Sequence, residues 1–449
     1  MTLSQSPPLP QPFVHRLHTQ WAAEEVSALC RAINRLDEAT VSLRVNPLKP
    51  VAPKAGWRPV AWCDGGYCLT ARPDFTADPL FHAGCYYVQE AASMAVAVAY
   101  EAMETKPALL LDLCAAPGGK STLWRSLMPS GALLVANEPV HNRAMILREN
   151  VQKWGHPDVL VTASLPENFG ALYGLFDAVA ADVPCSGEGM FRKDPDARSL
   201  WSEENAARCV QRQREIVRQA WQCLREGGYL VYSTCTFNPA ENEENVRWIC
   251  RELGAEVIRL DTNRFPSILN QDGMLHFLPH RTVGEGFFLA LIRKTASQNT
   301  LRLRRTEKTT AVPHGWIKEE KDFVGIRQTD GTICGLRTAL LPHSTAIRAA
   351  VRTIATGVEV AQPKGHKLQP AHALALSTLL NKDNFPKAEL TREESLRYLS
   401  RQSLTLSPSL PRGFVVATYE NHPIGFLNNL GTRANNLYPT EWRIRKTII

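Results

Sequence analysis

Two cysteines follow apolar runs that predict buried strands, and both lie in polar turns. Cys185 stands in Asp-Val-Pro-Cys-Ser-Gly after the run 176–181, and Cys235 stands in Ser-Thr-Cys-Thr after the run 228–232. A thiolate exposed in such a turn can act as a nucleophile. The carboxylate of Asp182 precedes the first cysteine by three residues. These residue types indicate nucleophilic chemistry with an acidic group close by.

A third segment predicts a binding turn for a nucleoside. The apolar run 109–113 is followed by Cys-Ala-Ala-Pro-Gly-Gly-Lys and a predicted helix, which is typical of a buried parallel strand that enters a βα loop. Gly118 and Gly119 allow a tight bend and the close approach of a ligand, and we expect Ser121 to cap the helix. A P-loop is disfavoured because its first glycine would fall at Cys114, and no Gly-x-Gly-x-x-Gly is present.

The next predicted strand, 133–137, ends at Glu138. A carboxylate at this position can accept hydrogen bonds from both ribose hydroxyls, as in other nucleotide-binding α/β folds. The turn and this acid together favour a nucleoside-containing cofactor over a turn that binds nothing.

The elements that must position these residues alternate along the chain. Further strands are predicted at 159–162 and 286–292, and helices at 203–224 and 242–253. Alternating strands and helices predict an α/β fold with a doubly wound, mostly parallel sheet. The carboxyl ends of its strands meet at one edge, so the cysteines, Asp182 and the glycine turn should converge there.

Composition excludes several other classes of protein. The chain has 449 residues and a net charge of +7, which is compatible with binding nucleic acid but does not require it. Its eleven cysteines include no Cys-x-x-Cys pair and no neighbouring histidine cluster, so we expect neither a metal site nor a disulfide framework. No apolar run reaches the roughly 18 residues of a membrane span, and the first twelve residues lack the pattern of a signal peptide. We expect a cytoplasmic protein whose helical cysteines, at positions 30, 209, 223 and 250, are inert.

Four regions are predicted along the chain. Residues 1–85 form a small α+β module with a helix at 21–36 and a strand at 41–46, and residues 86–295 form the main domain, which opens with a helix from 86 to about 103. A basic linker with Arg302, Arg304, Arg305 and Lys308 leads to a region at 311–380. A β-rich module at 381–449 follows, with a hairpin at 413–427.

At this point the sequence resembles a known family. The segments Asp-Leu-Cys-Ala-Ala-Pro-Gly-Gly-Lys at 112–120, Asp-Val-Pro-Cys-Ser-Gly at 182–187 and Ser-Thr-Cys-Thr at 233–236 are similar to the signature motifs of the Nop/Sun-type RNA cytosine-5 methyltransferases. Segments 44–46, 88–93 and 188–195 are similar as well. Residues 435–439 and 442–444 resemble the PUA-like tail of the RsmF-like bacterial branch, which acts on small-subunit ribosomal RNA.

The resemblance implies a Rossmann-like class I methyltransferase core, flanked by an N-terminal RNA-binding module and the PUA-like tail. It implies S-adenosylmethionine as cofactor. The residues assigned to the cofactor are Cys114, Ala115, Ala116, Pro117, Gly118, Gly119, Lys120, Glu138, Ser164 and Asp182. In the family an Asp commonly contacts the adenine at the position that aligns with Ser164, so we expect weaker cofactor binding in this chain.

The resemblance also assigns the catalytic residues. Carbon 5 of cytosine is a poor nucleophile until a thiolate adds at carbon 6, and Cys235 is implied as that thiolate. Cys185 is implied to assist release of the product. Asp182 would bind the pyrimidine edge, and Lys120 would keep that carboxylate in place and lower the pKa of a nearby thiol.

The implied partner is RNA whose target cytosine is unpaired or flipped out. Candidate phosphate contacts are Arg192, Lys193 and the linker arginines, and for Tyr438 and Trp442 core packing is favoured over base stacking. We expect a monomer.

Two alternatives stay open: methylation of transfer RNA or large-subunit ribosomal RNA, and a non-catalytic RNA-binding factor of ribosome assembly. A DNA cytosine methyltransferase is disfavoured, because that class takes its nucleophile from the Pro-Cys motif and would leave Cys235 unexplained.

Overall fold

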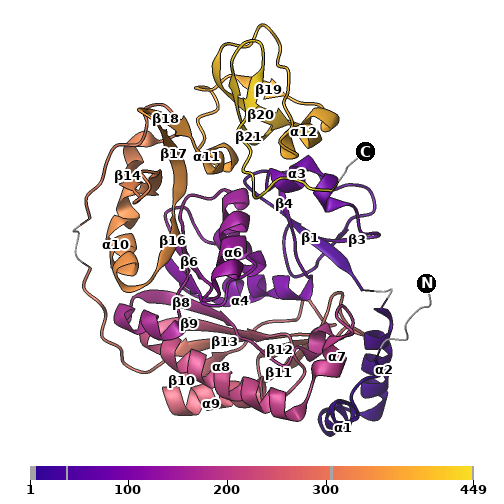
Figure 1. The fold of residues 1–449 in the computed structure, drawn as a ribbon. Helices are drawn as coiled ribbons and strands as arrows, with labels where there is room; N and C mark the ends of the chain where they lie inside the picture. Colours follow the sequence, from indigo (N-terminus) through magenta and orange to yellow (C-terminus); the bar gives the residue numbers. More distant parts are fainter. Residues whose placement is uncertain (1–6, 37–38, 304–306, 447–449) are drawn as a thin grey trace.

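A mixed sheet runs through the centre of the computed structural model, which describes residues 7–36, 39–303 and 307–446. Its strands follow the order β11-β12-β13-β9-β8-β5-β6-β7-β16, and β10 also pairs with β13 (Figure 1). The bounds are β5 (Leu109–Asp112), β6 (Leu133–Asn137), β7 (Val159–Thr162), β8 (Phe176–Asp182), β9 (Leu224–Thr234), β10 (Ala255–Ile258), β11 (Leu269–Gln271), β12 (Met274–Phe277), β13 (Phe287–Lys294) and β16 (Thr353–Thr356).

Strands β5 to β9 are parallel, and the strands outside them are antiparallel. The parallel strands are apolar runs buried on both faces, as a sheet covered by helices on two sides requires. The predicted α/β, Rossmann-like fold is confirmed. The sheet, however, is mixed and not mostly parallel, because β10, β11, β12, β13 and β16 add antiparallel pairs at its two edges.

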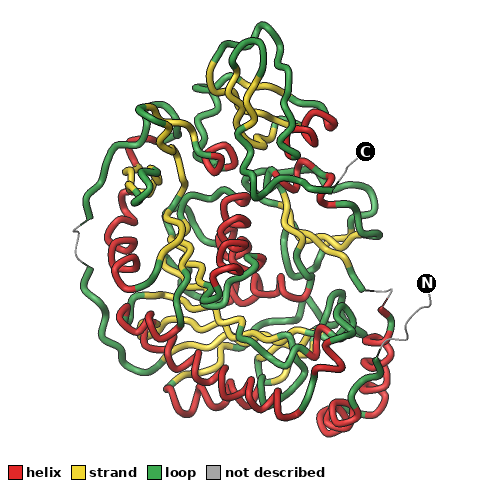
Figure 2. The backbone as a smooth tube through the Cα atoms, viewed as in Figure 1, coloured by secondary structure: helices red, strands yellow, loops and turns green. Residues whose placement is uncertain are grey.

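Helices cover both faces of this sheet (Figures 1 and 2). One face packs against α4 (Val96–Ala102), α5 (Gly119–Leu127) and α6 (His141–Trp154). The other packs against α8 (Glu203–Cys223) and α9 (Glu243–Leu253), and against α10 (Leu341–Ala350) from the C-terminal region. The short α7 (Ala197–Leu200) precedes α8.

The N-terminal region divides into two parts. Helices α1 (Gln11–Gln20) and α2 (Ala23–Asn34) pack on Phe191, Phe237 and Leu278 of the main domain. A separate antiparallel sheet has the order β2-β3-β1-β4. It consists of β1 (Val41–Val45), β2 (Arg58–Pro59), β3 (Gly66–Leu69) and β4 (Tyr86–Val88). The short helix α3 (Pro79–His82) lies between β3 and β4 along the chain. The prediction of a helix from residue 86 is therefore wrong at its start: Tyr86 to Val88 form a strand on β1, because aromatic and β-branched side chains suit a sheet.

Two further sheets lie in the C-terminal third. One has the order β14-β15-β17-β18, from β14 (Phe323–Arg327), β15 (Ile333–Arg337), β17 (Val358–Lys364) and β18 (Lys367–Pro370), and is followed by α11 (His372–Leu376). The other is β19 (Lys387–Glu389), β20 (Gly413–Tyr419), β21 (His422–Asn429) and β22 (Ala434–Asn436), with α12 (Arg392–Leu399) beside it. The predicted hairpin at 413–427 is confirmed as the antiparallel pair β20–β21.

The ends of the chain are joined by a common core. Leu43 and Tyr86 of the first sheet pack in one apolar cluster with Leu396 and Tyr398 of the last module, and these elements lie side by side at the upper right of Figure 1. In addition, β16 from the C-terminal third pairs with β7 and extends the central sheet. Packing therefore couples the regions that the sequence presents as separate. The boundaries at 85, 295, 311 and 381 stay predictions.

Candidate active site

The carboxyl ends of the parallel strands bring together the residues that the sequence singled out. Asp112 ends β5, Asn137 ends β6 directly before Glu138, and Asp182 ends β8. Cys235 follows the last residue of β9. Ser233 on β9 lies opposite Asp182 in the register of the two strands. The predicted convergence at one edge of the sheet is thus present in the structure.

The two turn cysteines are in direct contact. Their Sγ atoms are 3.2 Å apart, and the backbone N–H of Cys235 donates to Sγ of Cys185 at 3.4 Å. The hydrogen bond with Cys235, burial and the charge of Cys235 raise the pKa of the Cys185 thiol well above its usual value. At neutral pH Cys185 therefore holds its proton beside Cys235.

Lys120 and Asp182 form an ion pair next to these sulfur atoms. Lys120 Nζ lies 2.8 Å from Asp182 Oδ2, and the hydroxyl of Ser233 donates to Asp182 Oδ1 at 2.7 Å. Burial alone would lower the pKa of Lys120, but the adjacent Asp182 carboxylate outweighs it and raises that pKa. The Lys120 ammonium also lies 5.1 Å from the ring centre of Phe287. Lys120 and Ser233 together fix the direction of the Asp182 carboxylate.

The glycine turn begins α5 in a different way from the prediction. The residue before the helix is Gly118, with φ of 118°, and Ser121 lies inside the first turn. A side chain at Gly118 would meet Leu147 at 3.2 Å and would have to adopt a left-handed conformation. The expected cap by Ser121 is wrong: its hydroxyl donates to Asp112 Oδ2 at 2.6 Å, because the helix starts two residues earlier and turns Ser121 toward the strand.

Asp112 is a buried acid that connects this turn to the end of β5. Burial raises the pKa of Asp112 to about 7. Since this value exceeds the value of the unfolded chain, the protonated form stabilises the fold, and that stability is lost as the pH rises through 7. We expect wild-type protein to lose about 2–3 kcal/mol of unfolding free energy between pH 5 and pH 8 that an Asp112→Asn variant does not lose.

Urea unfolding of both proteins at the two pH values measures this difference. The matched control is Asp383→Asn, which alters an exposed aspartate. Parallel pH dependence in wild type and Asp112→Asn would show that the Asp112 carboxyl is not held in its neutral form.

The two cofactor candidates that follow β6 and β7, Glu138 and Ser164, are buried and already make hydrogen bonds within the protein. The Glu138 carboxylate accepts from the N–H of Val140 at 2.9 Å and lies 3.3 Å from Nη2 of Arg143. The Ser164 hydroxyl accepts from the N–H of Arg352 at 2.9 Å, where the chain enters β16. The hydroxyl of Ser164 thus connects the cofactor edge of the sheet to the C-terminal region.

The sequence analysis did not identify Glu241, whose side chain bonds to both of the turns that carry Cys185 and Cys235. The buried carboxylate of Glu241 accepts from the Ser186 N–H at 2.9 Å and the Ser186 hydroxyl at 2.5 Å on one turn. It accepts from Asn238 Nδ2 at 3.2 Å on the other turn and from Gln213 Nε2 at 3.0 Å on α8. Burial raises the pKa of Glu241 despite these hydrogen bonds. The signal in the sequence is the turn-forming segment Asn-Pro-Ala-Glu, which is separated from the Ser-Thr-Cys-Thr motif by one residue, Phe237.

A Glu241→Gln variant is expected to be less stable by about 2–3 kcal/mol and to lose most of its activity. Both oxygens of the Glu241 carboxylate accept hydrogen bonds, so in either orientation the NH₂ group of a glutamine would face hydrogen-bond donors. A buried donor that has lost its acceptor lowers the free energy of unfolding. Thermal or urea unfolding and methyl-transfer assays check this. The control is Glu244→Gln on the exposed side of α9, and equal behaviour of the two variants would contradict the positioning role.

Arg44 is a second positioning residue from the N-terminal sheet. Its buried guanidinium donates to Thr122 Oγ1 at 2.7 Å and to the carbonyl of Gly119 at 3.3 Å. It also donates to Gln89 and lies 4.4 Å from the ring centre of Trp154. Arg44 therefore fixes the start of α5 from outside the main domain.

The expected phosphate contacts are only partly available. Arg192 is buried in an ion pair with Glu285 at 3.0 Å and donates to the carbonyl of Gly284, so the prediction of a phosphate contact there is wrong. Its neighbour Lys193 is exposed and lies 4.0 Å from Glu285, so it is still available for a phosphate contact. Arg302 and Lys308 are exposed, whereas Arg304 and Arg305 lie outside the described residues.

The aromatic candidates of the tail pack in the core, as favoured. Tyr438 is 1% exposed and lies edge-on to Tyr398 and His372. Trp442 is half-buried against His372 and lies 5.1 Å from Lys153 Nζ. Across 7–36, 39–303 and 307–446, no helix is long and apolar enough to cross a membrane. In the same ranges no three or more His, Cys, Asp or Glu side chains gather as a metal site would require.

Three family models match the chain in succession. The first, described as the N-terminal domain of 16S rRNA methyltransferase RsmF, matches residues 9–91. The second, 16S rRNA methyltransferase RsmB/F, matches residues 98–293 and contains all the strand ends described above. The third, the PUA domain of methyltransferase RsmF, matches residues 385–444.

Individual relatives agree with these models. The chain is 34% identical over 439 residues to the ribosomal RNA small subunit methyltransferase F of Cronobacter sakazakii, with 89% of each chain covered. It is 33% identical over 435 residues to the protein of the same name from Escherichia coli O157:H7, again with 89% of each covered. Among solved structures, a methyltransferase homologue from Pyrococcus horikoshii is 27% identical with a TM-score of 0.51 and covers 64% of this chain and 100% of that one. NSun6 from the same organism, solved with SFG, shares the fold at 20% identity with a TM-score of 0.53, over 65% of this chain and 99% of that one.

Proposed function

The chain belongs to the RsmB/F family of 16S rRNA methyltransferases, and from this premise we propose that it methylates carbon 5 of a cytosine in small-subunit ribosomal RNA through a covalent Cys235–cytosine intermediate. The observation that carries the proposal is the contact between two cysteine sulfur atoms 3.2 Å apart, beside the Lys120–Asp182 pair. The relatives with which the chain aligns over nine-tenths of its length carry the name of a small-subunit rRNA methyltransferase. Such a substrate would place the reaction in the cytoplasm.

Cys235 is the proposed nucleophile. Its thiolate adds to carbon 6, the Sγ–C6 bond forms, and the electrons of the C5–C6 double bond make carbon 5 electron-rich. Asp182 accepts from the exocyclic amine at the pyrimidine edge, with its carboxylate held by Lys120 and Ser233. Because Lys120 carries its charge, it also stabilises a thiolate nearby.

S-adenosylmethionine, when bound, supplies an electrophilic methyl group. The residues present fit this molecule: small side chains at Ala115, Ala116 and Gly118 leave the backbone open to a ligand, and Glu138 is a carboxylate suited to ribose hydroxyls. The turn is held by α6, where Asn150 donates to the carbonyl of Pro117 at 2.8 Å. This chain's contribution is to hold the donor beside carbon 5.

Cys185 is proposed to assist release. After the new C5–CH₃ bond forms, the proton on carbon 5 must leave, the Sγ–C6 bond must break, and its electron pair returns to Cys235. The first cause of the raised pKa of Cys185 is Cys235 itself. Alkylation of Cys235 removes that cause, so the Cys185 thiol can first release its own proton to solvent. The Cys185 thiolate then accepts the carbon 5 proton, the C5–C6 double bond re-forms, and the electron pair of the Sγ–C6 bond returns to Cys235.

Ser164 gives a test of the cofactor pocket. An Asp in its place can accept from the adenine amine, so we expect Ser164→Asp to bind S-adenosylmethionine about five- to tenfold more tightly in calorimetry. Ser164→Ala is the control, because it removes the bond to the Arg352 N–H without adding an acceptor. Unchanged or weaker binding in Ser164→Asp counts against this residue's placement next to adenine.

RNA would be held in part by the last module. A groove there is lined by Arg392, Arg397, Arg443, Arg445 and Lys446, together with Glu393. Such a density of cations is suited to phosphate contacts, which position RNA without reading its sequence.

The function is tested by bisulfite sequencing of ribosomal and transfer RNA from cells with and without this protein. We expect one cytosine of 16S rRNA to lose protection when the protein is absent and to regain it with wild-type protein but not with Cys235→Ser. Loss of protection in transfer RNA or 23S rRNA would reassign the substrate, and no change in any cytosine would contradict the proposal.

A further inference from the structure

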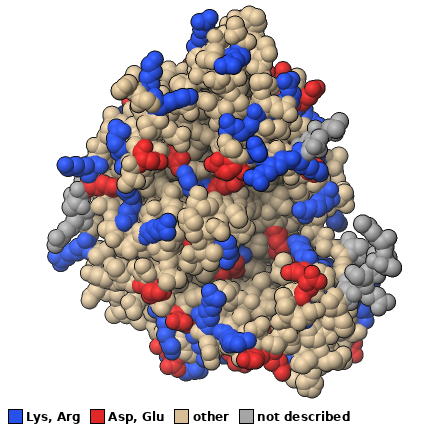
Figure 3. Space-filling view, viewed as in Figure 1, with Lys and Arg blue, Asp and Glu red and all other residues tan. Residues whose placement is uncertain are grey.

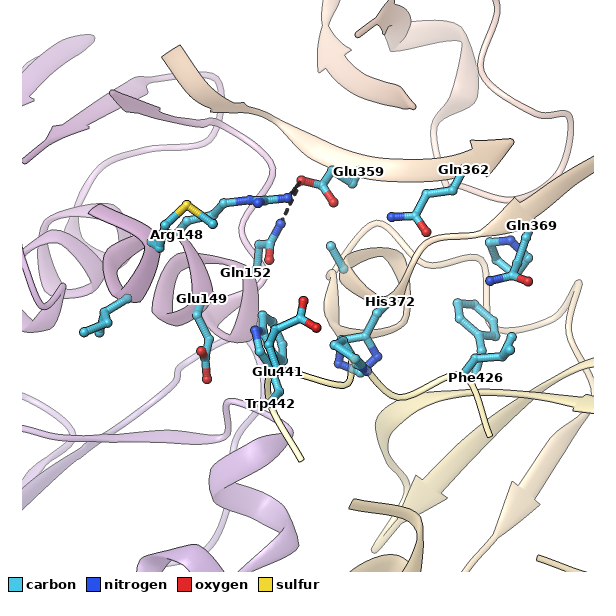
Figure 4. A pocket seen from close by; sticks show the side chains of 16 residues that line it. Arg148, Glu149, Gln152, Glu359, Gln362, Gln369, His372, Phe426, Glu441 and Trp442 are labelled. Carbon is cyan, nitrogen blue, oxygen red and sulfur yellow. Dashed lines mark hydrogen bonds and ion pairs between the residues drawn. The ribbon is translucent and has the colours of Figure 1, made fainter. Parts of the chain in front are cut away.

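A pocket of about 420 Å³ lies where three parts of the chain meet, apart from the residues assigned to catalysis. One wall is α6, with Ile146 and Gln152, and another is the β17–β18 hairpin with Gln362 and Gln369. The last module closes it with Trp442 (Figure 4). Pockets of this volume at domain junctions typically hold small ligands.

The charged groups of the pocket are largely neutralised by one another. Arg148 and Gln152 both reach from α6 to the carboxylate of Glu359, as the dashed lines of Figure 4 show. Glu149 is paired with Lys153 at 2.5 Å. Glu441 also lines the pocket, is exposed, and has no ion-pair partner among the described residues. The pocket therefore offers a ligand neutral hydrogen-bonding groups and this one carboxylate.

Several of these neutral groups have no partner within the described residues. The side-chain amide of Gln362 makes no hydrogen bond there, and Gln369 uses only its Oε1, which accepts from Lys364. Both ring nitrogens of His372 also lack a partner in that part of the chain. Burial lowers the pKa of His372 to about 3, so its ring is neutral. Buried nitrogens without a partner, such as those of His372, mark places where a water or ligand completes the bonding. The amide of Gln362 is exposed among the residues that line the pocket, so a ligand can reach it.

The remaining lining is apolar and aromatic. Trp442 and the ring of His372 lie edge-on to each other with centres 5.1 Å apart, and Ile146 is 51% exposed at the rim. A flat ligand with an amide-like edge suits such a site better than an aliphatic one.

A basic loop lies beside the pocket. Gln362 and Gln369 are opposite each other in the β17–β18 hairpin, whose exposed tip carries Lys364, His366 and Lys367. Cations at the tip can contact phosphates while the pocket binds a base. In protein–nucleic acid complexes, phosphate contacts typically position the nucleic acid and base contacts recognise its sequence. Figure 3 shows Lys and Arg side chains spread over the upper part of this face and a group of Asp and Glu across the middle.

We propose that this pocket binds one unpaired adenine of the RNA substrate, with the amide of Gln362 reading its edge and the hairpin tip contacting the adjacent phosphates. Glutamine pairs with adenine through two hydrogen bonds, to N6 and N7. The inference rests on the proposed function only in taking RNA as the substrate. A basic peptide is the disfavoured occupant, because Glu359 and Glu149 are already paired with cations and only Glu441, among the described carboxylates of the lining, is left for it.

The test is calorimetry of the full chain with the tetranucleotides r(A)₄ and r(U)₄, which contain no cytosine. Wild type is expected to bind r(A)₄ about tenfold more tightly than r(U)₄, and Gln362→Ala and Gln369→Ala should each reduce that preference about fivefold or more. Lys364→Ala should weaken both oligonucleotides alike and lower the salt dependence. Gln211→Ala, an exposed glutamine on α8, should change nothing.

Equal binding of the two oligonucleotides, or a preference that survives in Gln362→Ala, overturns the proposal. Binding of a tri-arginine peptide that depends on Gln362 also overturns it and assigns the pocket to a protein partner. Failure of cytosine methylation in the cellular assay, with the adenine preference intact, would contradict the proposed reaction and leave this pocket as an RNA site.

Discussion

Cys235→Ser is expected to reduce methyl transfer by about 10⁴-fold or more and to form no covalent RNA adduct. A serine hydroxyl ionises far less readily than a thiol, so carbon 6 of the cytosine would have no nucleophile, and removal of a nucleophile typically costs several orders of magnitude. The measurement is transfer of tritium from labelled S-adenosylmethionine to 16S rRNA or small subunits, with a denaturing gel for adducts.

The matched control is Cys250→Ser, a half-buried cysteine on α9 outside the site. It should keep nearly full activity. An adduct in Cys235→Ser, or activity within tenfold of wild type, would move the nucleophile to another residue, and Cys185 would be the first alternative because its sulfur lies 3.2 Å away.

Cys185→Ser is expected to have the opposite signature: little turnover, but an RNA adduct that survives denaturation. Addition at carbon 6 and transfer of the methyl group need Cys235, whereas release needs a base near carbon 5, for which the thiolate of Cys185 is our candidate. The serine hydroxyl would keep the volume of the site but not supply that base. The adduct should be seen as a band that requires both RNA and S-adenosylmethionine and that disappears on ribonuclease treatment.

A double variant tests which of the two cysteines carries the adduct. Cys185→Ser combined with Cys235→Ser should form no adduct, since the bond that persists in the single variant is to Cys235. Normal turnover by Cys185→Ser without a trapped species would show that the division of labour between the two cysteines is wrong, even if Cys235 is the nucleophile.

Interfaces between distant segments decided several features that local patterns misjudged. Arg192 appears in the sequence as a charged residue in a polar loop, yet Glu285, which is 93 residues away, pairs with it in the interior. Ser121 satisfies the local pattern of a helix cap, but the helix starts earlier and its hydroxyl meets Asp112. Such partners are invisible in a local pattern because the pairing depends on how strands and helices pack.

The amino-acid sequence alone predicted the type of chemistry, and it placed the candidate residues at the edge of the sheet where the structure has them. Cys185, Cys235, Asp182, Lys120 and Glu138 could be placed together because each follows, or immediately adjoins, a strand that local hydrophobicity predicts, and parallel strands end at a common edge.

Only the tertiary structure decided how these residues are held. The 3.2 Å contact of the sulfur atoms, the buried Glu241 beneath both turns, Arg44 at the start of α5, and β16 on the edge of the central sheet all depend on segments far apart in sequence. The physical reason is that local periodicity determines which segments become strands and helices, whereas contacts between segments far apart in sequence depend on the shape and hydrogen bonding of surfaces that exist only after folding.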